Sequence, residues 1–211
     1  MPARRLWIAL GVLVVMGWML VSAAFAQQED KPVEHFMVNN PAALTPQRAE
    51  TIYQNIAEQM GRNYRVSRRP EADAFLGWTR YNTAPYRSAT HGARYVSNYA
   101  NAIGKNYGNW EKAAPLPVGS VLAKDSFTAT SDGQVYAGPL FVMEKMPTGF
   151  HPPSGDWKYL MIMPDGSVFG ETKGDGSENV EFCIGCHAAR AEYDHLFFIP
   201  EEFRRQALMA Q

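Results

Sequence analysis

The chain has little cysteine, little net charge and no internal repeat. Of its 211 residues only two are cysteines, too few for the disulfide framework of small secreted domains. Lys and Arg number 20 against 21 Asp and Glu, a net charge of −1, so the basic surface typical of nucleic-acid binders is missing. With 46% hydrophobic and 19% charged residues, the composition is that of a globular chain forming one domain or two small ones.

The first 26 residues have the pattern of a secretory signal peptide. Arg4 and Arg5 supply a positive start, residues 6–25 carry no charge, and Ala24-Phe25-Ala26 forms a small-x-small cleavage site. The apolar run is also long enough to cross a bilayer as an uncleaved anchor. In either case the positive start stays inside and the remainder is exported. We therefore expect a periplasmic protein, with a membrane-anchored form as the alternative.

The exported part is predicted to consist of a tether at 27–44 and a single domain at 45–211. Thr45 and Pro46 form a good helix start, with Thr as N-cap and Pro at the first helical position. Apolar residues then recur at helical spacing until Gly61, which predicts a helix over 46–60.

Beyond Ala74 the sequence indicates short strands separated by turns. A short helix is predicted at 102–110 and a last helix from Pro200. Hairpin-joined strands without long helices between them imply an antiparallel meander. We therefore predict a mainly β (α+β) fold with a few short helices. The candidate strands are 74–80, 94–100, 118–128, 135–146, 157–163 and 167–171.

Cys183-Ile184-Gly185-Cys186-His187 is the attachment pattern of a c-type haem. Residues three apart on a helical turn share a face, so both thiols can add to the vinyl groups along one haem edge. His187 then gives a ring nitrogen to the iron. The motif predicts one covalently attached haem c per chain, held near the C-terminus.

Three other interpretations of these cysteines stay open. Cys183 and Cys186 could close a small, strained disulfide. They could be a thioredoxin-type redox pair, although that pair follows the first strand of an α/β unit. A zinc site would need two more ligands, where only His187 and His195 are near.

The position of the motif restricts the kind of cytochrome. A small electron-transfer cytochrome c has this motif near its start and a methionine ligand downstream. Here the only methionine after His187 is Met209, close to the chain end. A sixth iron ligand must then come from the β-rich body or be absent. Because no convincing ligand lies downstream and the upstream histidines lie in loops, we expect five-coordinate iron. Such an open position favours ligand binding or catalysis over electron transfer.

Several segments occur together in a characteristic order: Arg94–Asn101, Pro117–Phe127, Gly138–Lys145, Gly155–Trp157 and Cys183–His187. In this order they resemble the cytochrome P-460 family, which includes the cytochromes c′-beta. The resemblance covers residues 74–203. The predicted helix at 46–60 departs from it.

This resemblance implies an antiparallel β fold, a homodimer and one five-coordinate haem c. Family members oxidise hydroxylamine or bind nitric oxide. In the cytochromes P-460 proper, a strand lysine is bonded to the haem ring. Lys124, five residues after Gly119, stands at the matching place and is the candidate catalytic residue. The c′-beta members lack this bond.

The leading hypothesis is a periplasmic haem c oxidoreductase that acts on hydroxylamine or related nitrogen compounds and passes electrons to a redox partner cytochrome. The alternatives are a nitric oxide binder and a plain electron-transfer cytochrome with six-coordinate iron.

Alternation places Leu122 and Lys124 on one face of their strand, but Val121 and Ala123 make the opposite face look equally buried.

Other polar residues are expected to have structural roles. Arg94 is expected to form a surface ion pair and Glu144 to end its strand in solvent. His195 is expected to pack the C-terminal segment. The remaining histidines lie in the tether or in loops without a ligand partner at helical spacing; they are His35, His91 and His151.

Overall fold

The structure, a computed structural model, describes residues 41–113 and 115–205. The predicted signal peptide at 1–26, most of the predicted tether and Met209 lie outside these residues. Within the two described stretches, no helix is both long enough and apolar enough to cross a membrane.

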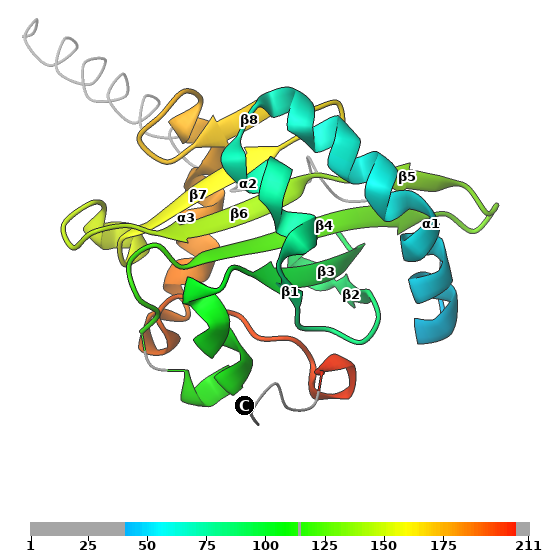
Figure 1. Ribbon diagram of the computed structural model, residues 1–211, viewed down its shortest axis with the longest axis horizontal. Coiled ribbons are helices and arrows are strands. Elements are labelled where there is room, and N and C mark those ends of the chain that lie inside the picture. The colour runs from blue at the N-terminus through cyan, green and yellow to red at the C-terminus, as the bar shows by residue number, and fades with distance from the viewer. Residues whose placement is uncertain (1–40, 114, 206–211) are drawn as a thin grey trace, which may run out of the picture. The chain divides into compact units, whose positions relative to one another are not determined.

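The core of the fold is one sheet of eight strands in which all pairs are antiparallel. Its main path runs β1-β3-β4-β6-β7-β8, while β2 pairs with β3 and β5 pairs with β4 (Figure 1). This confirms the predicted mainly β fold. The strands are β1 (Thr79–Arg80), β2 (Tyr86–Ser88), β3 (Arg94–Ala100), β4 (Val121–Ala129), β5 (Val135–Ala137), β6 (Leu140–Lys145), β7 (Trp157–Ile162) and β8 (Val168–Glu171).

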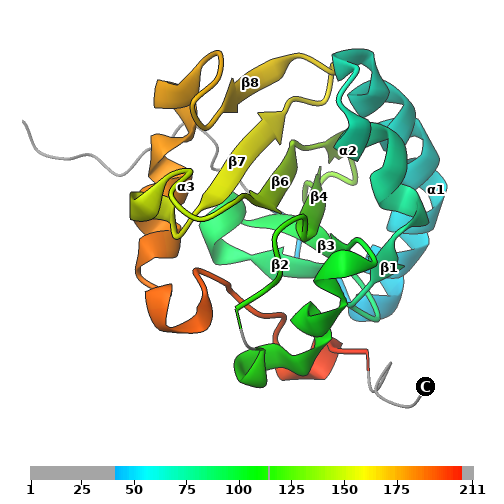
Figure 2. The same ribbon diagram turned by 60° about the vertical axis from the view of Figure 1, so that its left-hand side comes forward.

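Helices cover both faces of the sheet. The helices α1 and α2 lie over one face, and α3 lies on the other side of the sheet (Figures 1 and 2). The α-helices are α1 (Pro46–Tyr64), α2 (Pro70–Ala74) and α3 (Glu181–Ala188); the 3-10 helices are η2 (Arg65–Ser67), η3 (Phe75–Gly77), η4 (Ala89–His91), η5 (Ile103–Lys112), η6 (Pro152–Ser154), η7 (Ser177–Val180), η8 (Ala191–Tyr193) and η9 (Glu201–Phe203).

The helix α1 begins where the sequence predicts and ends later. Thr45 is the N-cap, and its Oγ1 accepts a hydrogen bond from the Arg48 N–H at 3.3 Å. The prediction that Gly61 ends the helix is wrong, since α1 continues to Tyr64. Gly61 instead allows a close approach, because a Cβ there would lie 2.6 Å from Leu76 Cδ1.

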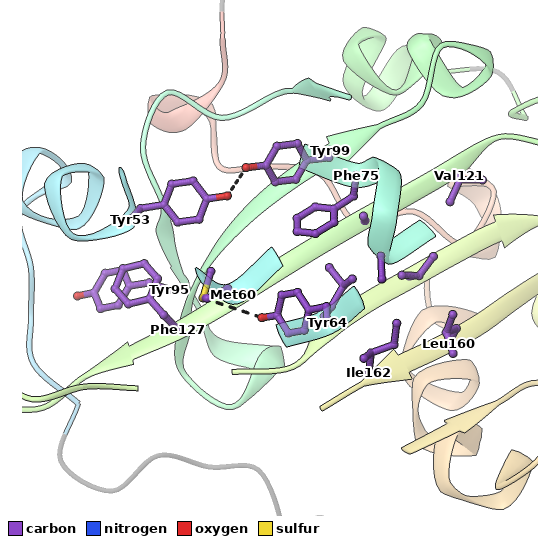
Figure 3. Packing of buried hydrophobic residues seen from close by; sticks show 14 of the residues in the cluster. Tyr53, Met60, Tyr64, Phe75, Tyr95, Tyr99, Val121, Phe127, Leu160 and Ile162 are labelled. Atoms are coloured by element: carbon purple, nitrogen blue, oxygen red, sulfur yellow. Dashed lines mark hydrogen bonds between the residues drawn. The ribbon is translucent and has the colours of Figure 1, made fainter. Parts of the chain in front are cut away.

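Aromatic side chains join α1 to the sheet. Tyr53, Met60 and Tyr64 of α1 are buried against aromatic residues of η3, β3 and β4 (Figure 3). Each large side chain buried in this way stabilises the fold by roughly 1.5–3 kcal/mol. Residues on both faces of the sheet are therefore buried. For this reason the alternation of residues along β4 does not show which face carries the site. The sheet residues in this cluster include Tyr95, Tyr99, Phe127, Leu160 and Ile162.

Several predicted boundaries need correction. The predicted strand 74–80 is mostly helical turns, and only Thr79–Arg80 joins the sheet. The predicted strand 135–146 is two strands that are interrupted at Gly138 and Pro139, because Pro139 has no N–H for the ladder. The predicted last helix is the single 3-10 turn η9, and β2 was not predicted.

Candidate functional site

The Cys-x-x-Cys-His motif lies on α3, as predicted. Cys183 and Cys186 are free thiols, the first half-buried and the second exposed. They do not form the disulfide that the sequence left open. Three positions apart on a helix, they present both sulfur atoms on one face. Burial raises the pKa of the Cys183 thiol to about 12.

His187 is held in one tautomer and one orientation. Its Nδ1–H donates to the His195 carbonyl oxygen at 2.7 Å. Its ring lies edge-on to Tyr159 and Phe197, with ring centroids 5.2 and 5.1 Å away. Burial lowers the pKa of His187 to about 4, so the ring is neutral at pH 7. Nε2 therefore keeps its lone pair, as an iron ligand requires.

The carbonyl that orients His187 is itself fixed by Asp194. The Asp194 carboxylate binds Lys145 Nζ at 2.5 Å and accepts the Leu116 N–H at 2.8 Å. The Asp194 carbonyl oxygen accepts the Trp157 indole N–H at 2.8 Å. His195 contributes through its backbone, and its ring packs against Gly155. This agrees with the expected packing role of His195.

The sheet face that meets α3, here called the motif face, is lined by two adjacent rows of side chains. In one row Leu122, Met143 and Tyr159 pair across β4, β6 and β7. In the next row Lys124, Phe141 and Met161 pair across the same strands. The apolar members pack in one cluster with Cys183 and Ile184 of α3. Lys124 therefore lies on the same side of the sheet as the motif.

Lys124 has no salt-bridge or hydrogen-bond partner among the described residues. Burial lowers its pKa to about 8, partly offset by Cys186. An amine without a counter-ion in apolar surroundings loses its proton more readily than a solvated lysine. Lys124 thus holds more neutral, nucleophilic amine near neutral pH than a solvated lysine does.

The structure places two further polar residues, Arg94 and Glu144, on opposite faces of the sheet. Arg94 is on the motif face, and a Cβ on Gly138 would lie 2.8 Å from Arg94 Cδ; burial lowers the pKa of Arg94. Glu144 lies on the α1 side of the sheet, where its carboxylate binds Lys158 Nζ at 2.5 Å. The expectation that Glu144 ends its strand free in solvent is therefore wrong.

Sequence reasoning missed His91. Its ring lies edge-on to Phe141 with centroids 4.8 Å apart, and its Nδ1 is 2.8 Å from Ser88 Oγ. No sequence signal marks it, because it has no ligand partner at helical spacing. Only the pairing of β2 with β3 brings its loop to the motif face.

These residues fit a covalently bound haem. Two thiols share one helix face, and a neutral imidazole keeps a free Nε2. The two rows of the motif face are apolar apart from Lys124 and the hydroxyl of Tyr159, which is buried without a partner in the described part of the chain. By contrast, no three His, Cys, Asp or Glu side chains gather into a metal-binding cluster anywhere in the described residues.

Comparison with known proteins gives one family. The Cytochrome P460 family matches residues 73–198, more than half of the chain. The match includes all eight strands and the Cys-x-x-Cys-His motif, and it begins after α1. No curated protein matches the chain at a significant level.

Proposed function

The chain belongs to the cytochrome P460 family, and from this premise we propose that it oxidises hydroxylamine or a related small nitrogen compound. We propose one haem c, attached through Cys183 and Cys186, with His187 as the iron ligand. The observation that carries the proposal is the position of Lys124, an unpaired lysine on the sheet face that meets the motif helix.

The residues of the chain provide what such a site needs. When bound, the haem would supply an iron that takes a small ligand and accepts electrons. His187 holds it in a fixed orientation through its bond to the His195 carbonyl oxygen. Phe141, Met143 and Met161 exclude water from the space beside it.

Lys124 distinguishes the two main candidate functions. The resemblance implies that oxidation of hydroxylamine accompanies a bond between this lysine and the haem ring. A partly deprotonated amine facing the motif favours this bond, since proximity lowers the barrier to its formation. A free Lys124 would instead favour nitric oxide binding, as in the c′-beta members. A plain electron-transfer cytochrome is the third candidate and requires a sixth protein ligand.

The reduced spectrum and turnover of the haem-loaded protein test the proposal. We expect a five-coordinate spectrum with a red-shifted main band, and hydroxylamine oxidation with an artificial electron acceptor. The variant Lys124→Arg should lose both features, while the variant of the exposed Lys105, Lys105→Arg, should retain them. Nitric oxide binding without turnover in the wild-type protein would refute the oxidase and support the binder. Sharp low-spin bands in both oxidation states would support the electron-transfer cytochrome.

The location and partners are part of the same proposal. The signal-peptide pattern of residues 1–26 supports export to the periplasm. The family resemblance supports a homodimer and a redox partner cytochrome. Cell fractionation tests the location. Sedimentation of the haem-loaded protein tests the dimer, which a single monomeric species at micromolar concentration would contradict.

A further inference from the structure

Two histidines reach the motif face at different rows. The His187 ring contacts Tyr159, in the row of Leu122 and Met143. The His91 ring contacts Phe141, in the row of Lys124 and Met161. The rows are two residues apart along each strand, or about 7 Å. The two imidazoles therefore contact adjacent rows of the motif face, and Lys124 belongs to the row contacted by His91.

The position of His91 is fixed by its own loop. His91 ends η4, and the chain turns back into β3 through Gly92 and Ala93, which have φ of 71° and 56°. A left-handed alanine costs roughly 1–2 kcal/mol, so the surrounding contacts must stabilise this turn. The ring Nδ1 lies 2.8 Å from Ser88 Oγ and 3.2 Å from Thr90 Oγ1.

The other ring nitrogen has no such partner. In the described part of the chain, no residue forms a hydrogen bond with His91 Nε2. Burial lowers the pKa of His91, and the neighbouring charges of Lys124, His187 and Arg94 lower it further. The ring is therefore neutral. In the tautomer in which Nδ1 accepts from the Ser88 hydroxyl, Nε2 carries the proton and can donate it.

We propose that His91 is the distal residue of the haem site and that its Nε2–H donates a hydrogen bond to the ligand on the iron, opposite His187. The inference rests on the proposed haem attachment but does not depend on hydroxylamine as the substrate. A neutral donor held by Ser88 and Phe141 would select ligands with a lone pair or negative charge beside the iron-bound atom. It also needs no reorganisation when the ligand binds.

Carbon monoxide on the reduced, haem-loaded protein is the direct probe. A distal donor lowers the C–O stretching frequency, so His91→Ala should raise it. His91→Gln keeps an N–H donor and should give an intermediate value. The stretch between iron and His187 should not change in either variant. Azide binding to the oxidised protein should weaken at least about tenfold in His91→Ala, since a hydrogen bond to a charged ligand is lost.

His151→Ala is the matched control, because it also removes an imidazole whose Nδ1 pairs with a serine hydroxyl, that of Ser154 in η6, at 3.1 Å. Where His91→Ala fails to fold, His91→Gln and Ser88→Ala give the same readout with smaller changes in volume. Equal C–O frequencies in wild-type, His91→Ala and His151→Ala proteins would overturn the proposal. A six-coordinate wild-type spectrum that becomes five-coordinate in His91→Ala would also overturn it, since His91 would then be an iron ligand. Absence of hydroxylamine turnover alters none of these readouts.

Discussion

The Nδ1–H of His187 donates to the carbonyl oxygen of His195 at 2.7 Å. This bond joins the end of α3 to the segment that follows it, and through Asp194 to Lys145 and Trp157 on the sheet. A hydrogen bond of this kind fixes the ring orientation of a metal-binding histidine and raises its basicity. The sheet thus sets the geometry of the proposed iron ligand.

The two cysteines should hold the haem covalently. Protein matured with a c-type haem attachment system should keep haem peroxidase stain after boiling and denaturing electrophoresis. The double variant Cys183→Ser/Cys186→Ser should lose that stain, because it lacks both thiols that form the thioether bonds. The variant Ser177→Ala, in the turn before the motif helix, serves as the control and should keep it. Covalent haem that survives the double change would contradict the assignment of the motif.

Asp194 should control the iron ligand from a distance. Asp194→Ala removes the partner of Lys145, whose side chain is 14% exposed in the pair. Loss of one member of a largely buried pair should lower the free energy of unfolding by about 3 kcal/mol. It should also broaden the iron–histidine stretch of the reduced protein, because the His195 carbonyl is no longer fixed. Glu192→Gln affects only an exposed contact with Arg190 and should change stability by less than about 0.5 kcal/mol. An unchanged iron–histidine stretch in Asp194→Ala would show that Asp194 does not fix the orientation of His187.

The parts of the site that are local in sequence could be predicted, and those that depend on packing could not. The motif predicted its own helical turn because both cysteines and His187 lie within one turn. Strand β3 was predicted with its observed bounds, and its Tyr95, Val96 and Tyr99 are residue types that favour strands. The face of the sheet on which Lys124 lies could not be predicted, because α1 covers the other face and residues on both sides of β4 are buried.

His91 and Gly61 show the same limit. His91 reaches the motif face only through the pairing of β2 with β3. The spacing of residues in the sequence predicts neither this pairing nor the course of the loop between the two strands. Gly61 looks like a helix end because glycine is common there. Its actual role is to admit Leu76, a contact from a segment that is not its neighbour along the chain.

Lys124 should be found bonded to the haem. Digestion of protein matured with its own attachment machinery should give one haem that joins the Cys183–Cys186 peptide to the peptide containing Lys124. The amine faces the motif helix and burial lowers its pKa to about 8, so its reactivity should exceed that of the exposed Lys105. Recovery of the Lys124 peptide without haem would exclude the cross-link and favour nitric oxide binding over hydroxylamine oxidation.

Asp125 should make the stability of the protein depend on pH. The side chain is 0% exposed on the α1 side of β4, and its Oδ2 accepts the Tyr53 hydroxyl at 2.6 Å. Tyr53 also contacts the Tyr99 hydroxyl (Figure 3). Burial raises the pKa of Asp125 from 3.8 to about 7, against the hydrogen bond from Tyr53, which lowers it. The protonated form is therefore favoured in the folded state.

A carboxyl whose pKa is higher in the folded state stabilises the fold fully below its unfolded pKa. That contribution is lost as the pH rises through the folded value. The free energy of unfolding should therefore fall between pH 4 and pH 7, by an amount on the order of 4 kcal/mol from this group. Asp125→Asn keeps an acceptor for Tyr53 but cannot ionise, so its stability should stay nearly level over this range. Tyr53→Phe removes the bond that lowers the pKa and should shift the loss to higher pH. Denaturant unfolding of the haem-loaded proteins at several pH values measures both effects; an equally steep fall in Asp125→Asn would assign the dependence to another group.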